Sequence, residues 1–149
     1  MALFGAPVAL EDHAFRAVQA ALAIQETISG YSSQLQRDYD MTVRLRVGLN
    51  TGMVVVGRIG DDLRMDYTAI GNTTNLAARL QSMAEPGTIL ITEVTYRLIE
   101  DYIHAEGLGQ VEIRGQFQPV AVYRVTSRQR WRSRLEINAE RGLTTLVGR

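Results

Sequence analysis

The spacing of apolar residues changes several times along this chain of 149 residues, and that change limits the fold more than any other feature. From Asp12 onward apolar residues recur three and four positions apart, which predicts an amphipathic helix that ends or bends at Gly30. Between Thr42 and Ile59 they alternate, which indicates strands. A second helix is expected from about Thr73 to Met83. This mixture predicts an α/β chain of the α+β sandwich type.

The other elements expected are short runs between turn residues. Met1 to Phe4 is an apolar run stopped by Gly5-Ala6-Pro7, and we expect a buried strand there. Within Thr42–Ile59 we expect two strands that pair as a hairpin, with a break at residues 50–52 and a polar glycine turn at residues 57–62. A short helix is expected at Val94–Tyr102, and further strands at Arg64–Ile70, Thr88–Thr92, Gln110–Ile113 and Val120–Val125.

Length and composition exclude several classes of function. The chain has the size of one domain. It contains no cysteine, so a disulfide framework, a thiolate zinc site and a cysteine nucleophile are excluded. Its apolar runs are far shorter than the roughly 20 residues of a membrane span. Because the first residues lack the basic and apolar regions of a signal peptide, we expect a cytoplasmic location and no membrane partner.

The charge is unevenly distributed although the formal net charge is zero. Ser127 to Arg149 contains six arginines and two glutamates, so this segment is basic and the preceding body is mildly acidic. Arginines spread in this way are typical of a solvated linker. Trp131 is a single aromatic residue among them, without the repeated spacing of nucleic-acid binders, so we expect no nucleic-acid partner.

The segment from Arg46 to Leu80 reads RVGLNTGMVVVGRIGDDLRMDYTAIGNTTNLAARL. Its Gly71-Asn72-Thr73-Thr74 turn leads into a helix, where free N–H groups and the helix dipole favour an anion. Asn75 and Arg79 are four residues apart and share one face of that helix. They are either an exposed polar stripe paired with a carboxylate or donors that stabilise charge on a reacting phosphate. The residues expected to point inward are Leu76, Ala77, Leu80 and Met83.

The order and spacing of these motifs resemble class III adenylate and guanylate cyclases. RVGLNTGMVVVGRIG followed by DYTAIGNTTNLAARL is similar to the family signature, and FGAP, DHA, IRG and QPVAVYRV are similar to its flanking segments. The resemblance covers Met1 to about Val125. It implies a ferredoxin-like class III nucleotidyl cyclase fold at residues 1–126, N-terminally truncated, and a basic linker at residues 127–149 that leads toward a following domain.

The resemblance also implies roles for individual residues. Asn75 would orient the ribose, Arg79 would stabilise the phosphoryl transition state, and Arg114 takes the position of a phosphate-binding lysine. Thr68 occupies the purine-selecting position, where threonine points to ATP rather than GTP. The implied function is that of an adenylate cyclase, which converts ATP to cyclic AMP and pyrophosphate in intracellular signalling.

Family members use Mg²⁺ or Mn²⁺ held by two aspartates, and both aspartates are expected in segments that precede Met1. Asp61, Asp62 and Asp66 are interpreted as turn and strand residues rather than replacement ligands. We therefore assign no metal ligand and expect the chain to be inactive alone. Family domains pair head to tail, so a homodimer or pairing with an intact cyclase domain is expected. The alternative is a noncatalytic nucleotide-sensing or dimerisation module on the same fold.

Overall fold

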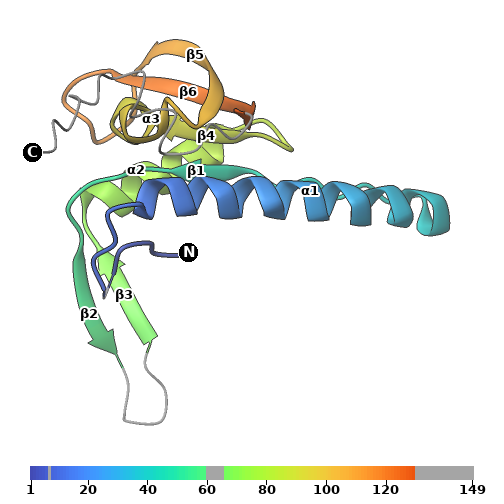
Figure 1. Cartoon of the computed structure of the whole chain (residues 1–149), viewed down its shortest axis with the longest axis horizontal. Coiled ribbons are helices and arrows are strands. Elements are labelled where there is room, and N and C mark those ends of the chain that lie inside the picture. The colour runs from blue at the N-terminus through green and yellow to red at the C-terminus, as the bar shows by residue number, and fades with distance from the viewer. Residues whose placement is uncertain (7, 60–65, 130–149) are drawn as a thin grey trace, which may run out of the picture.

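A computed structural model describes residues 1–6, 8–59 and 66–129, with the side chains of 56–59 and 66–70 left out of the description. Within these ranges the chain forms a four-stranded sheet, a separate two-stranded sheet and helices (Figure 1). No helix in the described ranges combines the length and apolar character needed to cross a membrane. The elements are α1 (His13–Tyr39), β1 (Val47–Leu49), β2 (Val55–Ile59), β3 (Asp66–Ile70), α2 (Asn72–Met83), β4 (Ile89–Thr92), α3 (Glu93–Ile99), β5 (Ile103–Val111) and β6 (Val120–Arg128).

The larger sheet has the strand order β1-β4-β6-β5. β1 runs parallel to β4, whereas β6 is antiparallel to both β4 and β5. All four residues of β4 are buried, because the strand lies inside the sheet and helices cover both faces. Ile89 and Ile91 belong to a core cluster with residues of α1 and α3, while Leu90 belongs to a second cluster with residues of α2. The alternation of side chains along a strand thus divides the core into two layers.

α1 is a continuous helix of 27 residues that runs through Gly30. Its buried apolar residues, Ala14, Val18 and Ala21, lie in the first half and pack against the sheet. The second half extends past the sheet in Figure 1. The helix ends where Asp40 adopts a left-handed conformation with φ 55° and its N–H bonds back to the carbonyl of Gln36.

The hairpin expected within Thr42–Ile59 is wrong. β1 pairs in parallel with β4, and β2 pairs in antiparallel fashion with β3. Alternating apolar residues predict a strand but do not identify its partner, and the chain between β1 and β2 is tied to α2 by a hydrogen bond from Thr73 to the carbonyl of Met53. β2 and β3 therefore project away from the larger sheet (Figure 1).

Other boundaries also differ from expectation. Met1–Phe4 forms no buried strand, because the segment pairs with none of the described strands and leaves Met1 and Phe4 exposed. Residues 57–59 of the turn expected at residues 57–62 are part of β2, and residues 60–62 lie outside the described residues. β5 begins at Ile103 rather than Gln110. Met83 is 43% exposed instead of buried, because the buried stripe of α2 continues at intervals of four residues to Ala84. Residues 64 and 65 of the strand expected at Arg64–Ile70 lie outside the described residues.

Candidate functional site

Asn75 and Arg79 are exposed on α2. The helix buries Leu76 and Leu80 against the sheet, and the residues that precede each of them lie on the neighbouring, solvent-facing stripe. Neither Asn75 nor Arg79 has a side-chain hydrogen bond or ion pair to another side chain that the structure describes. The paired-carboxylate interpretation is therefore not observed in the described part of the chain, and both side chains face solvent.

The first turn of α2 is fastened to the loop that follows β1. Asn50 Nδ2 donates to the carbonyl of Thr73 at 3.1 Å, and Thr73 Oγ1 donates to the carbonyl of Met53 at 2.6 Å. A Cβ at Gly52 would lie 2.7 Å from Thr73 Oγ1, so a larger residue at this position would displace the hydroxyl that makes this bond. These bonds set the position of the helix end that leads into Asn75.

A cluster of threonine hydroxyl groups holds the same loop, the one that follows β1, in place. Thr92 Oγ1 donates to Asn50 Oδ1 at 2.8 Å, and Thr95 Oγ1 lies 3.3 Å from Thr92 Oγ1 and 3.0 Å from Thr51 Oγ1. Thr92 and Thr95 are fully buried, and their hydroxyls find partners within this cluster. Sequence reasoning missed Asn50. Its signal was a polar residue placed directly after an apolar strand, in GLNTG.

α2 approaches β1 so closely that only glycine fits between them. A Cβ built on Gly48 would lie 2.3 Å from both the carbonyl oxygen of Ala77 and the nitrogen of Gln81. Gly48 lies inside β1, on the face that α2 covers. Its function is to let the helix backbone pack directly on the strand.

Arg114 is exposed at a tight turn formed by residues 113–116. The N–H of Gln116 donates to the carbonyl of Ile113 at 2.9 Å, and Gly115 has φ +87°, the positive value required at the third position of a type II turn. Ile113 is buried in the same cluster as Leu76 and Leu80 of α2. The fold therefore brings the Arg114 turn to the helix that carries Asn75 and Arg79, from far along the sequence.

Thr68 lies in β3, where its backbone pairs with Gly57 of β2. Its side chain is outside the described set, so its purine-selecting role stays a prediction. The same holds for Asp66, while Asp61 and Asp62 lie outside the described residues altogether. Trp131 and nearly all of the basic segment also lie outside them, beyond residue 129.

The described side chains do not fit a divalent metal ion. No three histidine, cysteine, aspartate or glutamate side chains in the described ranges come together at one point. Mg²⁺ needs several oxygen ligands in a near-octahedral arrangement, and Mn²⁺ also favours oxygen ligands. The described side chains therefore provide no ligand set for either ion.

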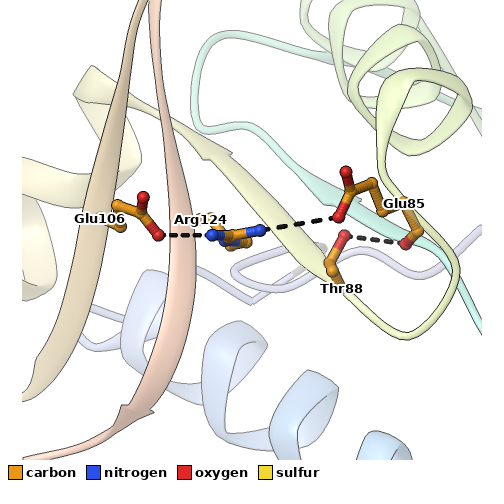
Figure 2. A network of polar contacts seen from close by, with 4 residues as sticks. All are labelled: Glu85, Thr88, Glu106 and Arg124. Atoms are coloured by element: carbon orange, nitrogen blue, oxygen red, sulfur yellow. Dashed lines mark hydrogen bonds and ion pairs between the residues drawn. The ribbon is translucent and has the colours of Figure 1, made fainter.

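An ionic network lies beyond the end of α2 (Figure 2). Arg124 of β6 contacts Glu106 of β5 at 2.5 Å and Glu85 at 3.6 Å, and Thr88 Oγ1 donates to the carbonyl of Glu85. The hydrogen bond that Arg124 donates to the Glu106 carboxylate, together with the negative charge of that carboxylate, raises the pKa of Arg124 above its ordinary value. This network connects two strands to the turn between α2 and β4 and contains none of the residues expected at the site.

Comparison with known proteins identifies related chains. Residues 1–127 match the family model described as the adenylate and guanylate cyclase catalytic domain. Adenylate cyclase 1 of Rhizobium meliloti (strain 1021) is 33% identical over 126 residues, covering 83% of this chain and 19% of that protein. The adenylyl cyclase CyaB from P. aeruginosa has a TM-score of 0.77 and 38% identity, covering 85% of this chain and 66% of that structure.

A third relative is the guanylate cyclase domain of RhGC from Catenaria anguillulae, solved in complex with GTP. It has a TM-score of 0.70 and 33% identity, with 85% of this chain and 66% of that one covered. The chain thus spans about two thirds of these solved domains and a fifth of the R. meliloti protein. The matches confirm both the α+β fold and the expected resemblance. This chain belongs to the class III adenylate and guanylate cyclase catalytic domain family.

Proposed function

We propose that this chain supplies one half of an adenylate cyclase site, the half that orients the ribose and stabilises charge on the reacting phosphate. The observation that carries the proposal is the exposure of Asn75 and Arg79 on one stripe of α2, with no partner among the described side chains. The turn that presents Arg114 is anchored on the same helix. We propose that these three donors, which come from two distant segments of the chain, bind a single ligand.

The reaction is an intramolecular phosphoryl transfer. The ribose 3′-hydroxyl attacks the α-phosphorus, a new ester bond forms, and pyrophosphate leaves. Positioning and charge neutralisation provide most of the catalysis in such reactions. Arg79 suits the second task, since its planar fork donates two parallel hydrogen bonds to phosphate oxygens, and the Asn75 amide can hold the sugar.

The partner we propose is an intact cyclase domain, or a second copy of the chain, in a head-to-tail pair. The Mg²⁺ or Mn²⁺ ion that family domains use would be held by an intact partner, because the described residues of this chain offer no such ligand set. ATP is the proposed substrate. Thr68 supports it, since a threonine hydroxyl can accept from the adenine amino group or donate to a ring nitrogen.

Complementation of an inactive partner tests this function. The partner is an intact adenylate cyclase domain whose own asparagine and arginine at the positions of Asn75 and Arg79 are replaced, so that it has metal ligands but no turnover. Addition of the chain is expected to restore cyclic AMP formation with Mn²⁺, and ATP is expected to be used in preference to GTP.

Variants of the chain identify the residues responsible. Arg79→Ala and Asn75→Ala are each expected to lower the restored kcat by about 10²-fold or more, the usual effect of removing one transition-state donor. Gln81→Ala is the control, because Gln81 is exposed on the same helix without a side-chain hydrogen bond in the described set. Restored turnover that survives Arg79→Ala contradicts the proposal.

The alternative function is a noncatalytic nucleotide-sensing or dimerisation module. The lack of a converging metal-ligand group among the described side chains favours it. Calorimetric titration with an ATP analogue and Mn²⁺ separates the two functions. Binding without turnover in every pairing indicates the sensor, while turnover in the complemented pair indicates the half-site.

A further inference from the structure

We infer that the side-chain amides of Asn72 and Gln116 form a clasp that positions Arg114 beside Asn75 and Arg79. Asn72 and Gln116 would then be positioning residues for the phosphate-binding part of the site. The inference rests on the proposed half-site. It adds a pair of side chains that fixes how the two segments of that half-site, α2 and the Arg114 turn, lie relative to each other.

The two amides bond to each other in both directions. Gln116 Nε2 donates to Asn72 Oδ1 at 2.7 Å, and Asn72 Nδ2 donates to Gln116 Oε1 at 3.4 Å. The two residues are 44 positions apart in the sequence. Asn72 is the first residue of α2, and Gln116 is the residue that closes the turn around Arg114.

The turn is held to α2 on both sides of Arg114. On one side, Ile113 is 5% exposed and belongs to the buried cluster of Leu76 and Leu80. On the other side, Gln116 is bonded to Asn72. Because Gln116 N–H also bonds to the Ile113 carbonyl, the two anchors are themselves connected, and Arg114 lies between them. Its guanidinium is exposed and has no bond or ion pair with the described side chains.

The periodicity of α2 places the clasp at the N-terminal end of the stripe that carries Asn75 and Arg79. Asn72, Asn75 and Arg79 follow each other at intervals of three and four residues, so they lie along one side of α2. The clasp therefore docks the Arg114 turn at the N-terminal end of the row formed by Asn75 and Arg79. A nucleotide held by that row would have its phosphates within the range of a third donor.

The clasp contributes to position more than to folding. Asn72 is exposed and Gln116 is half-buried, and an amide pair in contact with water adds little to stability. Loss of the pair leaves Ile113 anchored but frees the other side of the turn. The expected consequence is a more mobile Arg114, with the rest of the fold unchanged.

The first measurement is a double-mutant cycle on nucleotide affinity. A non-cyclising ATP analogue is titrated with Mn²⁺ into the chain paired with the same inactive partner domain. Arg114→Ala is expected to weaken binding about tenfold, as loss of one charge-assisted hydrogen bond does. Gln116→Ala is expected to weaken it about fivefold, and the double variant about as much as Arg114→Ala alone, because the clasp acts through Arg114.

Two further variants separate positioning from other effects. Exchange of the two amides, Asn72→Gln with Gln116→Asn, keeps both donors and acceptors and is expected to recover most of the parent affinity. Gln118→Ala is the matched control, since Gln118 is an exposed glutamine in the same loop without a bond to a described residue. It is expected to leave the affinity unchanged.

Hydrogen exchange provides a readout that does not depend on nucleotide. The backbone N–H of Gln116 is expected to exchange about fivefold faster in Gln116→Ala and Asn72→Ala than in the parent chain or in Gln118→Ala, because the turn opens more often. Near-parent rates elsewhere in α2 and β6 show that the fold is intact.

The outcomes discriminate between the clasp and the half-site. Additive effects of Gln116→Ala and Arg114→Ala, or unchanged exchange at Gln116, overturn the clasp while leaving the half-site in place. No analogue binding by the parent chain in the complemented pair overturns the half-site, and the positioning role falls with it. Coupled affinity losses together with faster exchange support both.

Discussion

Gly48 determines how closely α2 approaches the sheet. Any side chain at this position would meet the backbone of Ala77 and Gln81 at 2.3 Å, and backbone cannot move aside as a flexible side chain can. The glycine therefore sets the height of α2 above β1. It thereby sets the height of Asn75 and Arg79 on the outer side of the same helix.

Gly48→Ala is expected to lower the free energy of unfolding by about 2–3 kcal/mol, since the helix must shift to accommodate one methyl group. Urea unfolding followed by circular dichroism measures the change. Gly30→Ala serves as the comparison within the same chain. A loss below about 0.5 kcal/mol for Gly48→Ala, the usual range of surface changes, contradicts the close packing of α2 on β1.

Residues that share one face of a helix were predictable, and residues that meet across the fold were not. The four-residue spacing of Asn75 and Arg79 predicted a shared face, and the structure shows both exposed there. Nothing in the sequence spacing indicated that Asn72 would bond to Gln116, or that Asn50 would connect Thr73 to Thr92. Such contacts depend on how strands pair.

At the scale of the element, α1 shows a helix that tolerates a poor helix former. Gly30 was expected to end or bend the helix, yet α1 continues for nine more residues to Tyr39. A Cβ at Gly30 would meet nothing within 4 Å, so no packing requires the glycine. Alanine in an exposed helix interior has the higher intrinsic propensity and restricts the unfolded chain more than glycine does.

Gly30→Ala is therefore expected to raise the free energy of unfolding by about 0.5–1 kcal/mol. The midpoint of urea unfolding should rise, and the helical signal should stay at least as large as in the parent. A lower midpoint would show that the helix is interrupted at this position.

Element type was easier to predict than element partner. α2, β4 and β6 occur close to their expected positions, because their apolar spacing and flanking turn residues are local features. β1 was assigned the wrong neighbour, since its parallel partner β4 lies about 40 residues later and a whole helix intervenes.

At the scale of the molecule, Arg124 connects segments that are distant in sequence. Figure 2 shows its guanidinium between Glu106 of β5 and Glu85 of the turn after α2. The side chain of Arg124 is about one-third exposed, so water and salt screen both pairs. The network is expected to orient the end of α2 relative to the sheet rather than to stabilise the fold strongly.

Arg124→Met is expected to cause a small loss of stability that decreases as salt concentration rises, because screening already weakens the pairs in the parent. Urea unfolding at low and high ionic strength provides the measurement. Arg97→Met is the control, since the partner of Arg97 among the described residues lies within its own helix, Glu93 four residues earlier. A loss that is equally large at both salt concentrations assigns the effect to packing instead.

The sequence by itself determined the class of the fold, its family, the burial of Leu76 and Leu80 in α2 and the face that presents Asn75 and Arg79. These features follow from residue periodicity and from the order of motifs, both of which are local properties of the chain. The tertiary structure decided which strands pair, how closely α2 lies on β1, and that the Arg114 turn is held at the N-terminal end of α2. These features depend on contacts between residues tens of positions apart. Side-chain sterics and hydrogen-bond geometry select such contacts only once the sheet has formed.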